Sequence, residues 1–83
     1  MGKGPVTAKA LFLEGNRWMS AGDTHAAIQC YERAIALAPD FAEAHANLGM
    51  LLDQEGRSAE AERHYRRSIS LNPGYGETFM NLG

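Results

Sequence analysis

Small and apolar residues recur at intervals of three and four along two stretches of the chain, as in helices that bury one face. In the stretch before the proline at position 39 these residues are Ala27, Tyr31, Ala34, Ile35 and Ala38. In the stretch before the proline at position 73 they are Ala61, Tyr65, Ser68, Ile69 and Asn72. Pro39 and Pro73 should end both helices, because proline disfavours helix for the residue before it.

Each of these helices should follow another helix across a short turn. Gly22 and Gly56 stand where the first helices would end, and glycine suits the left-handed turn that closes a helix. Asp23 or Thr24 can then cap one second helix and Ser58 the other. The pattern therefore predicts two helix-turn-helix pairs and an all-α fold.

The start of the first helix in the second pair carries its own signal. Asp40 and Glu43 have the spacing of a capping box. In such a box the Asp side chain accepts a backbone N–H of the first turn, and the Glu side chain reaches back to the backbone of the cap residue. This spacing predicts a helix that starts at Phe41.

The chain repeats itself at an offset of about 34 residues without a gap. Aligned identities include Gly15 with Gly49, Gly22 with Gly56, Ala27 with Ala61, Tyr31 with Tyr65, Ile35 with Ile69 and Pro39 with Pro73. Residues 76–83 restate residues 42–49, so a third unit begins there. The expected organisation is a linker or tag-like segment at 1–7, repeats at 8–41 and 42–75, and the first part of a third repeat at 76–83.

Composition narrows the possible partners. The 83 residues suffice for one small domain, and the formal net charge of −2 is spread over intermixed acidic and basic residues. No basic face for nucleic acid is expected, and no apolar run is long enough for a membrane helix. Cys30 is the single cysteine, which excludes an internal disulfide and fits a reducing cytoplasm.

The residues that could carry catalysis are poorly spaced for it. No two of His25, His45 and His64 lie one helical turn apart, and Cys30 lies five residues from His25, off its helical face. The glycines match neither a dinucleotide-binding nor a P-loop spacing. We therefore expect no enzyme activity, no metal and no cofactor, and histidines at the surface or the edge of the core.

Residues 8–83 resemble the tetratricopeptide repeat family, whose pattern combines a large residue, Leu-Gly and an aromatic in the first helix with Ala, an aromatic and Pro in the second. The corresponding residues here are Leu11, Glu14, Gly15, Trp18, Ala27, Tyr31 and Pro39, then His45, Leu48, Gly49, Leu52, Ala61, Tyr65 and Pro73, then Phe79, Leu82 and Gly83. Glu14, His45 and Leu52 depart from the pattern. The resemblance implies a right-handed solenoid of antiparallel helix pairs, about two full units and the start of a third.

The same residues predict how each helix pair packs. Small residues at facing places, namely Gly15, Ala27, Gly49 and Ala61, should let the two helices approach closely. The space around them should be filled by Trp18, Tyr31, Leu52 and Tyr65.

In this family the first helices line the concave face where ligands bind. The resemblance therefore implies a peptide-binding surface made by Phe12, Asn16, Asn47, Met50, Asp53, Gln54 and Asn81. Asn47 and Asn81 are equivalent and would face the open groove as a ladder of amides, which can hydrogen-bond an extended peptide backbone. This ladder resembles that of O-linked N-acetylglucosamine transferases.

Alternatives remain for several of these residues. Asn47 is also explained as a solvated residue or a polar bridge between helices. Phe12 and Leu13 are also explained by packing against a preceding repeat or the N-terminal tail. The carboxylate clamp of chaperone-binding members is not expected, because Phe12, Glu77 and Asn81 stand where that clamp needs cations.

Two functions follow from the resemblance. The chain is expected to be a scaffold that binds a protein or an extended peptide, as a fragment of a longer array, or else a substrate-presenting segment of a larger enzyme such as a glycosyltransferase. Its open ends are also expected to associate, since a solenoid unit buries its apolar face only against a neighbour. The two ends would be Leu11 and Phe12 on one side and Tyr75, Phe79 and Leu82 on the other.

Overall fold

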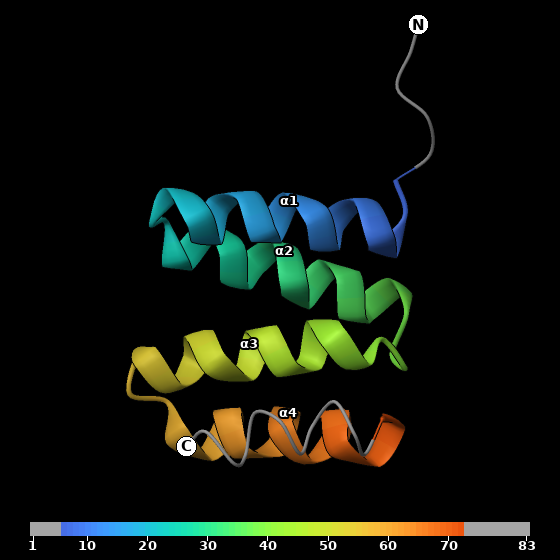
Figure 1. Ribbon diagram of the computed structural model, residues 1–83, viewed down its shortest axis with the longest axis vertical. Coiled ribbons are helices and arrows are strands. Elements are labelled where there is room, and N and C mark those ends of the chain that lie inside the picture. Colours follow the sequence, from blue (N-terminus) through green and yellow to red (C-terminus); the bar gives the residue numbers. More distant parts are fainter. Residues whose placement is uncertain (1–5, 73–83) are drawn as a thin grey trace, which may run out of the picture.

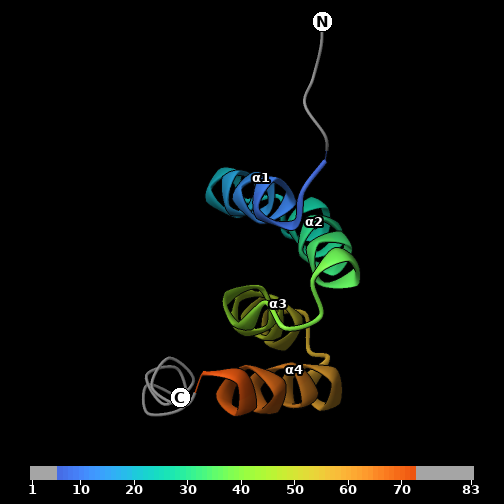
Figure 2. The same cartoon turned by 90° about the vertical axis from the view of Figure 1, so that its right-hand side faces the viewer.

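The computed structural model describes residues 6–72, which form four α-helices and no strand (Figure 1). The helices are α1 (Ala8–Ala21), α2 (Thr24–Leu37), α3 (Ala42–Gln54) and α4 (Ser58–Leu71). Helix α1 packs on α2, α2 on α3, and α3 on α4. Figure 2 shows two stacked hairpins, with α1 and α3 on the same side of the stack. The all-α fold of stacked helix pairs is confirmed, whereas the third unit predicted at 76–83 lies outside the described residues.

The turns inside both hairpins depend on glycine, as predicted. Gly22 has a φ angle of 87° and Gly56 one of 82°, both in the left-handed region. A Cβ at either position would meet nothing within 4 Å. Backbone conformation and not lack of space therefore favours glycine there. Asp23 then caps α2, because its carboxylate accepts the backbone N–H of Ala26 at 3.1 Å.

The other two predicted caps are wrong. Helix α3 begins at Ala42, and the cap residue Phe41 makes no side-chain capping bond, so no capping box forms with Asp40. The ring of Phe41 instead packs on Phe12, with centroids 4.9 Å apart, and this apolar contact orients the chain as it enters α3.

Helix α4 is capped one residue earlier than expected. Arg57 and not Ser58 is the cap residue, and it makes no side-chain capping bond. Its guanidinium binds the Glu60 carboxylate through two bonds of 2.7 and 3.0 Å. This exposed pair spans the first turn of the helix, and the Arg57 bond lowers the pKa of Glu60.

The hydrophobic core joins the two hairpins. It contains Ala27, Ile28 and Tyr31 from α2, Leu48, Leu51 and Leu52 from α3, and Ala61 from α4. Close approach within each hairpin requires glycine: a Cβ on Gly15 would lie 2.6 Å from Cε1 of Tyr31, and one on Gly49 would lie 3.0 Å from the Tyr65 ring. The predicted packing of these small residues is confirmed.

Trp18 does not fill the core as predicted, since it is 40% exposed. Its equivalent at the 34-residue offset is Leu52, which is 1% exposed because α2 packs on that side of α3. No described helix packs on the same side of α1. Leu13 is likewise exposed.

Candidate peptide-binding groove

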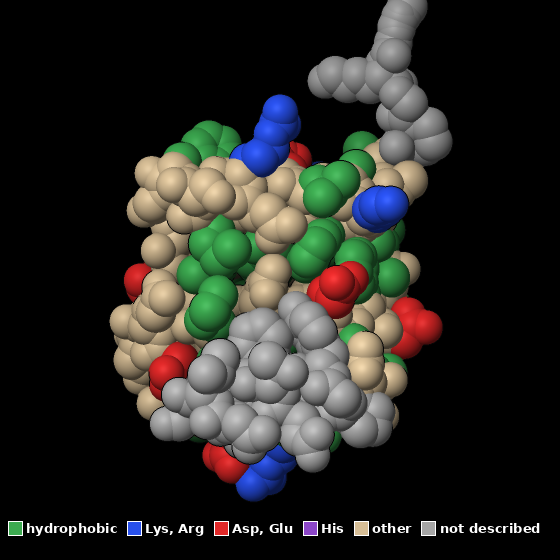
Figure 3. Space-filling view, viewed as in Figure 1, with side chains coloured by type: hydrophobic (Ala, Val, Ile, Leu, Met, Phe, Trp, Pro, Cys, Tyr) green, Lys and Arg blue, Asp and Glu red, His purple; other side chains and the backbone are tan. Residues whose placement is uncertain are grey.

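Helices α1 and α3 each turn one set of half-buried side chains to the same face of the molecule. Phe12, Asn16 and Met19 follow each other at four and three residues along α1, and Asn47 and Met50 lie three apart on α3. Figure 3 shows hydrophobic side chains gathered in the band between these two helices. We call these five side chains the groove residues.

Two of the groove residues, Asn16 and Asn47, belong to a hydrogen-bonded polar cluster. Tyr31 Oη donates to Asn16 Oδ1, and Asn47 Nδ2 donates to Asn16 Oδ1 at 3.2 Å and to Tyr31 Oη at 3.4 Å. The three residues come from α1, α2 and α3, so the cluster links the two repeats. Asn47 was expected to face an open groove, but it is half-buried and its amide N–H groups also bridge helices.

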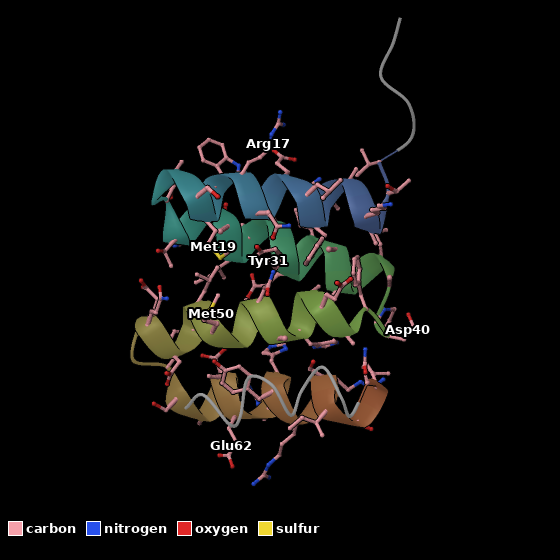
Figure 4. All side chains as sticks on the ribbon, in the orientation of Figure 1. Arg17, Met19, Tyr31, Asp40, Met50 and Glu62 are labelled. Carbon is pink, nitrogen blue, oxygen red and sulfur yellow. The ribbon has the colours of Figure 1, made fainter. Side chains whose placement is uncertain are left out.

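Aromatic and sulfur-containing side chains flank this cluster. The Phe12 ring lies 5.7 Å from Tyr31 and 4.9 Å from Phe41, measured between centroids. Phe12 therefore packs on α2 and on the connection between α2 and α3. On the other side Met19 Sδ lies 3.9 Å from Tyr31 Oη. Figure 4 shows Met19 and Met50 on this face, one from each helix.

The remaining residues of the predicted surface lie away from the polar cluster. Asp53 and Gln54 are exposed at the last turn of α3. Asn81 and the repeat-ending Pro73 lie outside the described residues. The groove residues themselves carry no formal charge, so any ligand they hold is recognised by amide hydrogen bonds and apolar contact.

Sequence reasoning missed a pair of histidines inside the second hairpin. His45 Nδ1 and His64 Nδ1 lie 3.0 Å apart, and His45 Nε2 lies 2.9 Å from the Pro39 carbonyl oxygen. The alignment of the two repeats could have indicated this pair. The equivalents of His45 and His64 are Leu11 and Cys30, which are both buried in the first hairpin. Two apolar partners are thus replaced together by two histidines.

The other reactive side chains stay apart. His25 is exposed on α2, while Cys30 is buried, and burial raises the pKa of its thiol. Within residues 6–72 there is no group of three or more side chains suited to holding a metal ion. None of the four helices is long and apolar enough to cross a bilayer.

Comparison with known proteins agrees with this architecture. Two crystal structures of MamA superpose with a TM-score of 0.79 at 33% sequence identity. The match covers 83% of this chain but 40% and 38% of those two chains, so this chain spans well under half of their length. No curated protein sequence matches significantly.

The family model for the tetratricopeptide repeat matches residues 12–76, which include most of the first hairpin and all of the second. The repeat of about 34 residues, the glycine turns and the paired helices account for that match. The chain belongs to the tetratricopeptide repeat family.

Proposed function

We propose that this chain binds an extended segment of another protein across the groove residues, without catalysing a reaction. Proteins of this family generally serve as scaffolds for protein–protein interaction. The observation that carries the proposal is the Asn16–Tyr31–Asn47 cluster, which sets two amides side by side on the face formed by the first helices.

The chemistry of the cluster favours a peptide backbone as its ligand. Asn47 uses its N–H groups within the protein, and no described residue donates to its carbonyl oxygen. That oxygen can accept a backbone N–H from a ligand. Met19 and Met50 on one side and Phe12 on the other offer adaptable apolar contact for neighbouring side chains.

Titration with blocked peptides of about nine residues tests this proposal. An alternating Leu-Ser peptide supplies both backbone and apolar side chains, and an all-Ser peptide serves as the ligand control. We expect the Leu-Ser peptide to shift the NMR signals of the Asn47 amide and the Met19 and Met50 methyl groups. Asn47→Ala should weaken binding about tenfold, corresponding to one hydrogen bond of ~1.4 kcal/mol.

Gln29→Ala is the matched control, because Gln29 carries the same amide group on the exposed surface of α2. Its affinity should equal that of the wild type. Asn47→Ala should also cost ~1 kcal/mol of stability through its lost bonds, so affinities are compared where all variants are folded. An equal loss of peptide affinity in both variants would contradict binding in the groove. So would NMR shifts that are confined to residues on the surface of α2.

A second candidate function is presentation of a substrate peptide to a glycosyltransferase domain elsewhere in a larger enzyme. Asn47 alone favours it, since its partner in the predicted ladder, Asn81, lies outside the described residues. Capture of peptides on the groove separates the two functions. Captured segments that carry O-linked sugar on serine or threonine would support the second, and unmodified segments the first.

Self-association through the first hairpin is a further part of this proposal. The internal interface buries Leu48, Leu51 and Leu52 of α3 against α2, whereas the equivalent positions of α1 are exposed. Trp18 is one of these, at the edge of a shallow depression. The other expected partner surface, at 75–82, lies outside the described residues.

Light scattering over a concentration series tests this association. The mean mass should rise with concentration, and Trp18→Ser should lower that rise, because it removes the largest exposed apolar side chain of α1. Substitution of the exposed His25 by Ser should leave the rise unchanged. A constant monomer mass for the wild type at every concentration would exclude self-association.

A further inference from the structure

The histidine pair occupies a position where a proton changes a contact between helices. His45 is 6% exposed and lies on α3, while His64 is half-buried on α4. The two rings are tilted by 30° with centroids 5.2 Å apart. Neither histidine is one of the groove residues.

The carbonyl oxygen of Pro39 determines where the protons sit. A carbonyl oxygen only accepts, so His45 Nε2 must carry the hydrogen that it donates to Pro39. A neutral His45 then has a lone pair at Nδ1, and the 3.0 Å contact requires His64 Nδ1–H to donate to it. His45 is thus the Nε2–H tautomer and His64 the Nδ1–H tautomer.

This arrangement tolerates one added proton but not two. A proton on His64 Nε2 leaves the Nδ1–H donor in place, and the contact persists. A second proton has only His45 Nδ1 to occupy, which sets two N–H groups and two positive charges against each other. The contact then has no acceptor and becomes repulsive.

We propose that His45 and His64 form a pH-sensitive latch that ties α4 to α3 and to the α2–α3 connection and opens when the pair takes up its second proton. The Pro39 bond extends the effect, because it anchors the connection that leads to Phe41. Phe41 packs on Phe12, so the latch also supports one flank of the groove.

Three of the four influences on the pKa of His64 lower it. Burial in the first place, then the facing His45 on α3 and then Arg63 on α4, lower the pKa of His64, and Glu60 on α4 acts in the opposite sense. No carboxylate of α2 or α3 within the described residues is among the charges that act on it. The folded protein therefore binds protons less readily than the unfolded chain. The latch contributes its stability above a pH of about 6.5 and loses it as the pH falls below that value.

Ring-nitrogen NMR at about pH 7.5 gives the first test, in the full chain. We expect His45 as the Nε2–H form and His64 as the less common Nδ1–H form. On titration His64 should take up its proton at a pH below the ordinary histidine value of about 6.5. An Nε2–H tautomer at His64, or titration at or above that value, would overturn the latch.

Thermal unfolding at about pH 7.5 and pH 5.5 gives the second test, above the range where carboxylates titrate. The Tm of the wild type should fall by several degrees between the two. The His64→Gln variant keeps an N–H donor but takes up no proton, so its Tm should fall less than half as far. The Tm of the control variant His25→Gln should fall as far as that of the wild type. A fall in His64→Gln equal to that of the wild type would overturn the proposal, and if that variant does not fold, the NMR titration decides.

Discussion

Replacement of Tyr31 by Ala should cost ~3–5 kcal/mol of folding free energy, which is a large part of the total for a protein of this size. The Tyr31 side chain is fully buried and belongs to the core that joins α2 with α3. Its hydroxyl also holds Asn16. Urea unfolding followed by circular dichroism should show the variant largely unfolded, or with a strongly lowered midpoint.

Tyr31→Phe separates the ring from the hydroxyl. This variant keeps the packing and loses the hydroxyl bonds, so it should cost only ~1 kcal/mol. Asn47 Nδ2 still donates to Asn16 Oδ1 in this variant, which limits the loss. A Tyr31→Ala midpoint as high as that of Tyr31→Phe would show that the ring does not support the core.

Replacement of Leu51 by Ala should cost ~2–5 kcal/mol, because it opens a cavity between the two repeats. Leu51 is 1% exposed and belongs to the same core as Ile28 of α2. In a solenoid, stability depends on the interface between neighbouring repeats. Denaturant unfolding should therefore show a lower midpoint and a less cooperative transition.

Arg17→Ala is the matched control for Leu51→Ala. Arg17 is the equivalent residue at the 34-residue offset, yet it is exposed and points away from the stack (Figure 4). Its replacement should change stability by no more than about 0.5 kcal/mol. Equal effects of the two substitutions would mean that α1 and α3 are covered alike, contrary to the fold described above.

The sequence predicted the positions of the site residues on their helices, but not the contacts between them. Sequence patterns placed Asn16 and Asn47 on first helices and therefore on a common face, which the helical period is enough to indicate. They did not indicate that the two amides and Tyr31 bond to one another. That contact joins residues 31 positions apart and depends on how closely the two hairpins stack.

The fold itself was largely determined by the sequence. Gly22 and Gly56 marked the turns, Ala27 and Ala61 the close helix contacts, and Pro39 the end of α2. Each of these signals acts through the backbone or through neighbours one helical turn away, so a single sequence reveals it. Most of these signals occur at equivalent positions in both repeats, which makes each assignment more specific.

Only the tertiary structure decided which copy of a repeated position is buried. Trp18 and Leu52 hold equivalent places, but α2 covers only Leu52, and no property of either residue indicates this. His45 and His64 are 19 positions apart, and their contact depends on the geometry of the α3–α4 hairpin. Exposure and long-range hydrogen bonds are set by what packs against a helix, whereas the helix and its turns are set by the residues within it.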